Sequence, residues 1–392
     1  MAASCIPFCE VWFVADVKPK KHSRNSPFRV IRVKKPSRGI GYTLLQAIAF
    51  LIVFIALLEG IARTRLISDL RPYQSYGSWH YQLDIKWFRL KQYVADNGDV
   101  DVIILGNSEV NTGFNPDVIT QAYYEKTGLR LRIFNFGVDG LTIAPNSVNT
   151  KLLVEKYHPA LLVFVTEMRD YDAMNGLEAQ GMFLSNPWVQ YQMGGFNPTG
   201  WIIDHSVAIQ HYLPYRNWMR SDFPNTFAAY LQTYHTTSLA GYEPDYGEMN
   251  AVSAPTQNDL TDNPYFDNSR PYQINPSRLA CLQAILDLAR NDGPQIVVVE
   301  MPVHPVFFDY VGGETVHKAF QEKIAETVQA GSGIFLPAID EVSIPLEGRA
   351  NLTHLNWRGA PILSAYLGEK LAALANQDGM TFVNEQNGDS QR

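Results

Sequence analysis

The chain has 392 residues, of which 46% are hydrophobic and 18% are charged, a balance typical of a globular protein and not of a disordered one. Its formal net charge is −7, yet residues 1–39 carry nine Lys or Arg and two Asp or Glu, while the remaining residues carry 23 Lys or Arg and 37 Asp or Glu. An acidic body of this kind argues against nucleic acid as a partner.

A long apolar segment, 40–62, follows the basic tail 1–39, and its first 19 residues are uncharged. As a helix it would rise about 34 Å, enough to cross the hydrocarbon core of a membrane. The basic tail is expected to remain in the cytoplasm. Because no small-residue cleavage site follows, we predict an uncleaved signal anchor in the cell membrane, with the domain 66–376 outside the cytoplasm. The alternative is a buried helix of a soluble domain.

The rest of the chain alternates between apolar runs and helical patterns. DVIILG is apolar after its first residue, as expected of a strand that is buried on both faces. Because strands joined by helices pair in parallel, we predict an α/β fold, a flavodoxin-like three-layer sandwich that binds ligands at the carboxyl ends of its strands. The predicted strands are 101–106, 131–138, 159–168, 295–303 and 334–339. The predicted helices run from Asn115-Pro116 to about Glu125 and over about 145–157, 277–290, 313–329 and Trp357–Ala375.

Residues 171–275 do not follow this alternation. They combine little periodicity with many Trp and Tyr residues and frequent Pro, Asn and Gly. Because a structureless loop of this length is unusual in a compact domain, we predict an insertion that packs over the strand ends as a cap. Its aromatic side chains suit either a glycan-binding or partner-binding surface or a small satellite core. The polar tail 377–392 is predicted to be disordered.

Cysteine usage is compatible with a domain outside the cytoplasm. Cys5 and Cys9 lie in the basic tail and Cys281 is alone in the body, so the body can form no internal disulfide. We predict no cofactor. We also predict no metal, because the spacing of the histidines in the insertion does not match a metal site. These histidines are His205, His211 and His235.

Ser108 directly follows the first predicted strand, and His354 precedes the last predicted helix. Both are therefore expected at the carboxyl edge of the sheet, where an imidazole that reaches the hydroxyl would make it a nucleophile. The N–H group of Ser108 and one from the glycine turn, Gly137 or Gly140, are candidate oxyanion donors. Taken singly, a serine after a strand is usually a cap, and a histidine before a helix is usually a cap or a packing residue.

The order of LGNSE, NFGVDG, VTEMRD and NLTHLN resembles the sequence blocks of the SGNH (GDSL-like) hydrolase superfamily. More narrowly, it resembles the membrane-anchored branch that acts on cell-envelope polymers and includes alginate acetylation and teichoic-acid D-alanyl transfer proteins. The resemblance spans roughly 100–375 outside the insertion. It implies that Ser108 is the nucleophile, that Gly137 or Gly140 is an oxyanion donor and that His354 is the base.

Two positions depart from this pattern. The family's third block usually offers an Asn side chain to the oxyanion, whereas this chain has Arg169 or a neighbour there, and an arginine can also stabilise an oxyanion. The final block is usually Asp-x-x-His, and here it begins with Asn351. An Asn oxygen can accept the imidazole N–H but cannot stabilise the imidazolium by charge, a change that costs about 10⁴ in kcat in serine proteases. Asp340 is an alternative source of the carboxylate.

Three further polar residues lie near the same predicted edge. His304 follows the fourth predicted strand, where it either lines the cleft or is a loop residue held between prolines. Glu167 and Asp170 either pair for acid–base chemistry or bind Arg169 and cap a helix.

Two functions remain open at this point. The first is an anchored serine esterase or O-acyltransferase that acts on acyl esters of a cell-envelope or exported polysaccharide. The second is a catalytically degenerate domain of the same fold that serves as a binding or scaffold subunit for a membrane protein partner, for which the changes at Asn351 and in the third block and the aromatic insertion argue.

Overall fold

The computed structural model describes residues 38–70, 73–78, 80–172, 181, 183–251, 271–290, 293–377 and 382. The basic run of the tail, Cys5, Cys9, part of the insertion and the predicted disordered tail beyond residue 377, except residue 382, lie outside the described residues. The chain divides into two compact units, 1–55 and 56–392.

One helix among the described residues is long and apolar enough to cross a membrane. Helix α1 (Arg38–Ala62) contains the stretch Gly41–Ala62, whose mean hydropathy is 2.5 and whose side chains are exposed except near its end. An apolar helix that buries so little of this surface against protein differs from a core helix of a soluble domain. This apolar stretch is followed by a short helix, α2 (Arg65–Leu70).

The sheet of the second unit has five parallel strands in the order β2-β1-β3-β4-β5. This is the flavodoxin-like order, so the predicted α/β fold class is confirmed. The strands are buried almost throughout, which explains their apolar sequences. They are β1 (Val102–Gly106), β2 (Ile133–Gly137), β3 (Leu161–Thr166), β4 (Gln295–Glu300) and β5 (Ile334–Leu336).

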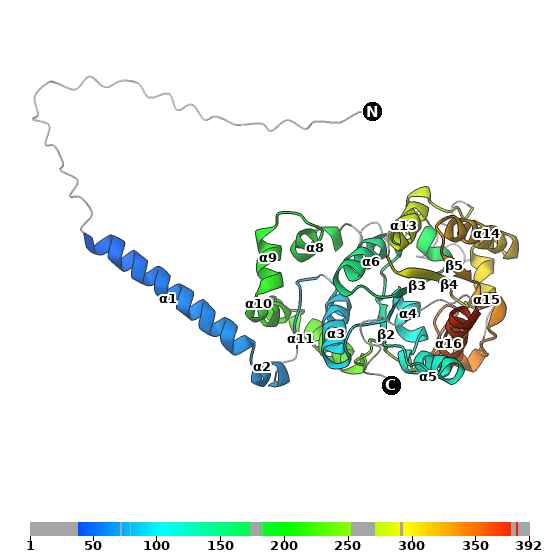
Figure 1. Cartoon of the computed structure of the whole chain (residues 1–392), viewed down its shortest axis with the longest axis horizontal. Coiled ribbons are helices and arrows are strands. Elements are labelled where there is room, and N and C mark those ends of the chain that lie inside the picture. The colour runs from blue at the N-terminus through cyan, green and yellow to red at the C-terminus, as the bar shows by residue number, and fades with distance from the viewer. Residues whose placement is uncertain are drawn as a thin grey trace, which may run out of the picture. The chain divides into compact units, whose positions relative to one another are not determined.

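Helices cover both faces of this sheet (Figure 1). Helices α5 and α16 pack on each other on one side, and α6, α13 and α14 lie on the other. The apolar side chains of the strands and of these helices form the main core. The helices that flank the sheet are α3 (Tyr81–Asn97), α5 (Pro116–Thr127), α6 (Ile143–Tyr157), α13 (Pro276–Leu286), α14 (Glu314–Ala330) and α16 (Ala360–Gln377).

The helices begin and end close to the predicted residues, with small differences. Asn115 caps α5 by accepting a hydrogen bond from the Asp117 N–H, and Pro116 occupies the first turn, as expected. Helix α16 begins at Ala360 and not at Trp357, because the Asn356 side chain accepts from the N–H groups of Arg358 and Gly359 and holds a turn there. Helix α13 ends at Leu286 and continues only as a short 3-10 helix, η3 (Asp287–Ala289).

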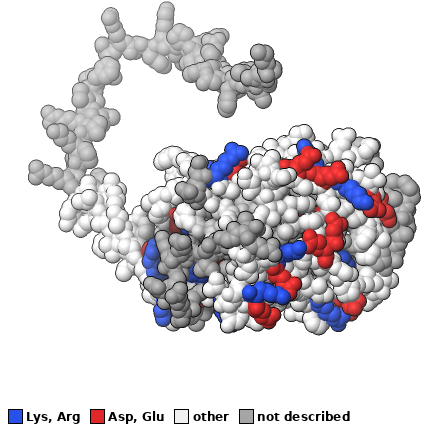
Figure 2. All heavy atoms as spheres, turned by 45° about the vertical axis from the view of Figure 1, so that its right-hand side comes forward, with Lys and Arg blue, Asp and Glu red and all other residues white. Residues whose placement is uncertain are grey.

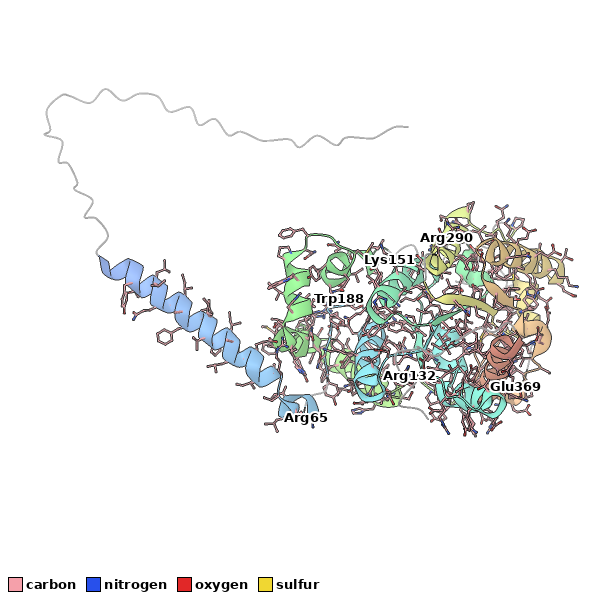
Figure 3. The ribbon with its side chains drawn as sticks, viewed as in Figure 1. Arg65, Arg132, Lys151, Trp188, Arg290 and Glu369 are labelled. Atoms are coloured by element: carbon pink, nitrogen blue, oxygen red, sulfur yellow. The ribbon has the colours of Figure 1, made fainter. Side chains whose placement is uncertain are left out.

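The described part of the insertion is largely helical. Trp188 joins it to the main core by stacking on Tyr76 and meeting Trp87 of α3 edge to face, and Figure 3 labels Trp188 beside α6. Most of these helices therefore pack beside the sheet and not over the carboxyl ends of its strands; among the described residues of the insertion, the segment around Glu243–Gly247 is bonded to the loop before α16 at that edge. The helices are α8 (Pro187–Gln192), α9 (Pro198–His205), α10 (Val207–Tyr212) and α11 (Phe223–Thr236).

Charged side chains of both signs are interspersed over the face shown in Figure 2. Many form local pairs between neighbouring helical turns, such as Lys318 with Glu314 and Lys151 with Glu155. Such exposed pairs contribute little to stability but keep the surface soluble.

Candidate active site

The end of β1 delivers Ser108 to the carboxyl edge of the sheet. Ser108 is the first residue of α4 (Ser108–Gly113), and Asn107 caps this short helix by accepting from the Glu109 N–H. Two glycines permit the tight connection. A Cβ at Gly106 would lie 2.4 Å from Val110 Cγ2, and a Cβ at Gly137 would lie 2.2 Å from the Asn111 nitrogen. The glycines of the LGNSE and NFGVDG runs therefore let α4 approach the ends of β1 and β2.

The structure brings together the two residues on which the sequence argument rests. His354 Nε2 lies 2.7 Å from Ser108 Oγ, which is hydrogen-bond distance. His354 belongs to the loop before α16, and this loop is fixed to the site because the Asn356 side-chain amide donates to the Glu347, Arg349 and Gly247 carbonyls. A serine hydroxyl in contact with an imidazole is the pair that nucleophilic catalysis requires.

The other ring nitrogen of His354 is held by neutral partners. Nδ1 lies 2.9 Å from Thr353 Oγ1 and 3.1 Å from Asn351 Oδ1, and the same Asn351 oxygen accepts from the Thr353 and His354 N–H groups. These acceptors favour the tautomer with a proton on Nδ1, which leaves Nε2 free to accept from the serine. Asp340, the alternative carboxylate, is not brought to the ring: it lies in α15 (Ala338–Glu341) and accepts from Gln321.

Burial, and after it the positive charge of Arg169, lowers the pKa of His354 to about 4, while Asp245 acts in the opposite direction. The imidazole is therefore neutral at neutral pH. A neutral imidazole whose Nε2 faces a hydroxyl is in the protonation state that a general base needs.

The two glycines that were candidate oxyanion donors differ in whether their N–H groups are already hydrogen-bonded. The Gly137 N–H already donates to Asn135 Oδ1 at 2.8 Å, so it is engaged within the sheet edge. Among the described residues, the N–H groups of Ser108 and Gly140 have no protein acceptor. Gly140 adopts φ +70°, a left-handed conformation that glycine favours, and the space where a Cβ would stand is open.

Arg169, the candidate from the third block, lies in the short 3-10 helix η1 (Met168–Tyr171) and forms ion pairs with two buried carboxylates. One is Glu109, beside the nucleophile, and the other is Glu167, at 2.6 Å. Glu167 and Asp170 form a capping box at η1, which is the capping role considered for them. Burial raises the pKa of Asp170 to about 6 and raises that of Glu167 well above its usual range. Arg169 thereby ties η1 to α4.

A buried lysine, which the sequence did not indicate, holds together the segments that form the site. Lys86 of α3 is fully buried and donates to Asn111 Oδ1 at 2.7 Å and to the Asn135 and Gly241 carbonyls. Asn111 in turn donates to Asp139 and Glu243. The cluster thus joins the nucleophile helix, the glycine turn and the insertion. In the sequence, Lys86 differs from its surroundings only as a lysine between large apolar residues, and the structure shows that the whole run Gln82–Phe88 is buried.

The insertion also contributes residues to the rim of the site, which the sequence did not localise. The Trp357 N–H donates to the Asp245 carbonyl at 2.8 Å, so the loop of His354 and the segment around Glu243–Gly247 lie together. Tyr246 and Trp357 expose 70% and 44% of their surface there. Exposed rings beside a reactive pair offer flat faces to a substrate.

The remaining candidate, His304, meets the site through its backbone, because its N–H donates to the Leu352 carbonyl in the loop of His354 at 2.7 Å. His304 caps the 3-10 helix η4 (Pro305–Tyr310) by accepting from the Val306 N–H, which agrees with the loop alternative. Among the residues that the structure describes, no three His, Cys, Asp or Glu side chains are grouped as a metal site would require.

No protein-family model matches the sequence, and no curated protein matches it significantly. Two solved structures are distantly similar to the chain. A putative acylhydrolase from Bacteroides fragilis has 10% sequence identity and a TM-score of 0.34, and the match covers 72% of this chain and 93% of the other. A gut microbial diltiazem-metabolizing enzyme has 13% identity and a TM-score of 0.33, with 70% of this chain and 47% of the other covered.

Proposed function

We propose that this chain is a serine esterase or O-acyltransferase that is anchored in a membrane by α1 and acts outside the cytoplasm. The observation that carries the proposal is the 2.7 Å contact between Ser108 Oγ and His354 Nε2 at the carboxyl edge of the sheet. The low pKa of His354, about 4, supports it because the base is neutral at working pH.

In this proposal Ser108 Oγ attacks the carbonyl carbon of an acyl ester while His354 Nε2 takes the hydroxyl proton. The tetrahedral oxyanion accepts hydrogen bonds from the Ser108 and Gly140 N–H groups, which have no protein acceptor among the described residues. The alcohol leaves with the proton returned by His354, and the acyl group stays on Ser108. Water or a second hydroxyl then attacks the acyl-enzyme, again with His354 as the base.

The proposed substrate is an acylated polysaccharide of the cell envelope or one that is exported. Tyr246 and Trp357 support this choice, because both rings are exposed in two segments that are bonded to each other beside the loop of His354, and exposed rings provide stacking faces of the kind that sugar rings use. Transfer to a second hydroxyl, in place of hydrolysis, requires that water be excluded from the acyl-enzyme. The segment around Glu243–Gly247 lies where it can contribute to this exclusion.

The test is acyl chemistry on the full chain in detergent. Wild type should hydrolyse a chromogenic acetyl ester and react with a fluorophosphonate probe, and Ser108→Ala should lose both, with kcat/KM falling about 10⁴-fold or more. Ser277→Ala is the matched control, because Ser277 also lies in the first turn of a helix behind an Asn cap, but its hydroxyl donates to Asn275 and has no histidine partner among the described residues. Equal labelling of wild type and Ser108→Ala would refute the proposal.

A second candidate function is a non-catalytic scaffold of a membrane complex. One observation favours it: the partners of His354 Nδ1 are Asn351 and Thr353, which carry no charge to stabilise an imidazolium. In that case Ser108→Ala should leave co-purification with partner proteins and cellular function unchanged. Loss of function in this variant, with assembly intact, would exclude the scaffold.

A further inference from the structure

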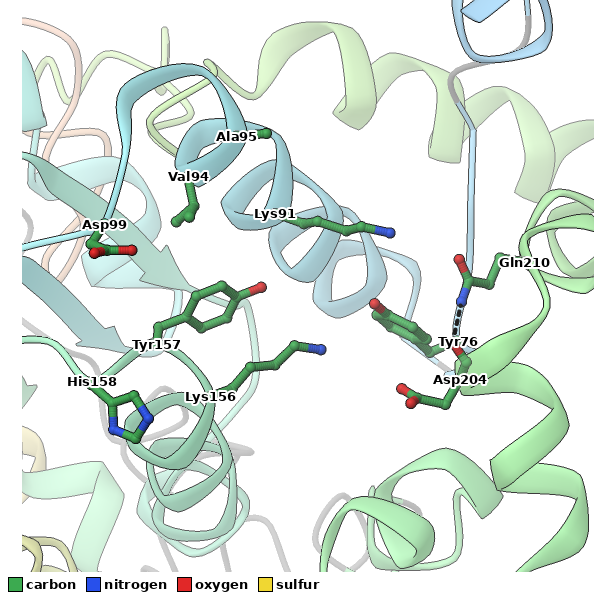
Figure 4. Close-up of a pocket in the computed structure, with 10 residues that line it drawn as sticks. All are labelled: Tyr76, Lys91, Val94, Ala95, Asp99, Lys156, Tyr157, His158, Asp204 and Gln210. Atoms are coloured by element: carbon green, nitrogen blue, oxygen red, sulfur yellow. Dashed lines mark hydrogen bonds between the residues drawn. The ribbon is translucent and has the colours of Figure 1, made fainter. Parts of the chain in front are cut away.

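A second hollow lies at the opposite end of the strands from Ser108. It has a volume of about 690 Å³ and is lined by α3, the end of α6, α9 and α10 (Figure 4). Two lining residues, Asp99 and His158, immediately precede the regions where β1 and β3 begin, so this pocket belongs to the amino ends of the strands. No step of the acyl chemistry proposed above uses it.

Two lysines point into this pocket. Lys91 and Lys156 extend toward the same space from α3 and α6 (Figure 4), and neither forms an ion pair among the described residues. Burial lowers the pKa of both ammonium groups, and the charge of Lys156 contributes to the lowering for Lys91, while the carboxylate of Asp204 on the opposite wall acts in the other direction on both. An anion placed between them would offset the repulsion and the lost hydration. Tyr76 and Tyr157 line the same wall.

The opposite wall offers hydrogen-bond acceptors. Gln210 is 2% exposed; its Nε2 donates to the Ile203 and Asp204 carbonyls, and its Oε1 has no hydrogen-bond partner among the described residues. A buried acceptor without a donor is costly, so a hydroxyl supplied by a ligand would be stabilised there. Cations on one side and an acceptor on the other suit a ligand that carries both a phosphate and a hydroxyl group.

The helices that line this pocket are bonded to the end of the apolar helix. Glu59, in the last turn of α1, accepts from Ser206 Oγ and from the Val207 and Ala208 N–H groups at the start of α10. Arg63, just beyond α1, donates to the His205 carbonyl at the end of α9, and its charge also lowers the pKa of Lys91. The pocket therefore lies close to the point where α1 ends.

The surface of α9 near this point is apolar. Trp201 and Ile202 are 51% and 46% exposed, and Phe196, two residues before the helix, is 98% exposed. The helical rise of about 1.5 Å per residue puts the two helix residues within about 6 Å, along the axis, of the His205 carbonyl that Arg63 binds. Exposed Trp and other large apolar side chains next to a membrane span are typical of the lipid–water interface.

We propose that this pocket binds the phosphodiester headgroup of an anionic phospholipid, with the phosphate between Lys91 and Lys156 and a headgroup hydroxyl on Gln210. The inference rests on the membrane-anchor part of the proposed function, since a lipid reaches the pocket only if α1 lies in a bilayer. The exposed side chains of α9 then contact the acyl chains or the interface.

The test uses the full chain purified in detergent. Native mass spectrometry measures retention of added phosphatidylglycerol and phosphatidylcholine, and calorimetry measures binding of inorganic phosphate. Lys91→Ala/Lys156→Ala should weaken phosphatidylglycerol binding by about tenfold for each ammonium removed, and Lys91→Arg/Lys156→Arg should retain it. The control is Lys151→Ala/Lys318→Ala. It removes two exposed lysines, each of which is paired with a glutamate on its own helix.

Each outcome decides the matter. Phosphatidylglycerol binding that is lost only in the pocket variant supports the proposal. Equal loss in the control, equal binding of phosphatidylcholine, binding of inorganic phosphate without lipid, or no binding at all overturns it. Ser108→Ala should bind the lipid as wild type does, so a failure of the acyl chemistry remains distinguishable. Resistance of the wild-type chain to alkaline extraction from membranes tests the anchor independently.

Discussion

Helix α3 carries two lysines, five residues apart, in opposite surroundings. Lys86 is fully buried at the carboxyl edge of the sheet, where three acceptors surround its ammonium group. Lys91 lies at the other end, where it points into a hollow and repels Lys156. Lys86, whose hydrogen-bond acceptors belong to the chain itself, stabilises the segments that carry the reactive pair. Lys91, which forms no such bonds among the described residues, is available to bind a ligand. The same residue type therefore has a structural role at one end of α3 and a proposed binding role at the other.

The largest effect should come from removing the internal partner. Lys86→Met leaves Asn111 Oδ1 and two buried carbonyls without this donor, and we expect a loss of about 3 kcal/mol in the free energy of unfolding. The measurement is urea denaturation of the full chain in detergent. Lys91→Met on the same helix is the matched control and should change stability by less than about 0.5 kcal/mol. Equal stability of the two variants would contradict the comparison.

The pH dependence of catalysis tests the electrostatics of the carboxyl edge. Because burial, and then Arg169, lower the pKa of His354 to about 4, kcat/KM should fall only as the pH drops through about 4. The sign follows from the mechanism, since the imidazole must be unprotonated to accept the Ser108 proton. At pH 5 the enzyme should keep nearly full activity, whereas a histidine with the ordinary pKa of about 6.5 would lose about thirtyfold.

Arg169→Gln should move this acidic limb to higher pH, because it removes the charge that opposes protonation of His354. Arg290→Gln is the control: Arg290 is exposed and paired with Asp287 after α13, so the limb should stay in place. A limb near pH 6.5 in wild type would show that His354 is solvated and not held as the geometry indicates.

A smaller effect is expected from restoring the family's aspartate. Asn351→Asp keeps the oxygen that accepts from the Thr353 and His354 N–H groups and adds a charge beside Nδ1. It should raise the pKa of His354 and increase kcat/KM by about tenfold, because the imidazolium is then stabilised. Asn275→Asp, at the cap of α13, is the control for a charge added elsewhere. Unchanged or lower activity in a folded Asn351→Asp variant would argue for the scaffold alternative.

The sequence predicted the carboxyl edge well because local signals converge there. Apolar runs end in LGNSE and NFGVDG, and the parallel topology then brings Ser108 to the edge that the loop of His354 also reaches. It could not separate Gly137 from Gly140, because that depends on the Asn135 side chain occupying one N–H. Nor could it assign Lys86, whose partners come from three distant segments.

The pocket at the amino ends was beyond sequence reasoning for a different reason. Lys91 and Lys156 look like ordinary solvent-facing lysines of two helices, and nothing in their spacing relates them. Only the packing of Trp188 against Tyr76 and Trp87 brings α9 and α10 of the insertion beside α3 and α6 and closes the hollow. The aromatic residues were predicted to form either a binding surface or a satellite core, and in Trp188 the packing role is present.

The smallest effect should be seen when the pocket lysines are removed without a ligand. Both side chains reach solvent and neither forms an ion pair among the described residues, so Lys91→Ala/Lys156→Ala should change the free energy of unfolding by less than about 0.5 kcal/mol. Relief of their mutual repulsion makes the expected sign slightly stabilising. With added phosphatidylglycerol, wild type should instead be more stable than the double variant. A ligand that binds only the folded state raises the Tm of the protein that binds it, by an amount that grows with its occupancy. A Tm that rises equally in the double variant would mean that the lipid binds elsewhere. Lys86 and Lys91 would then differ only in how deeply they are buried, and not in whether they bind a ligand.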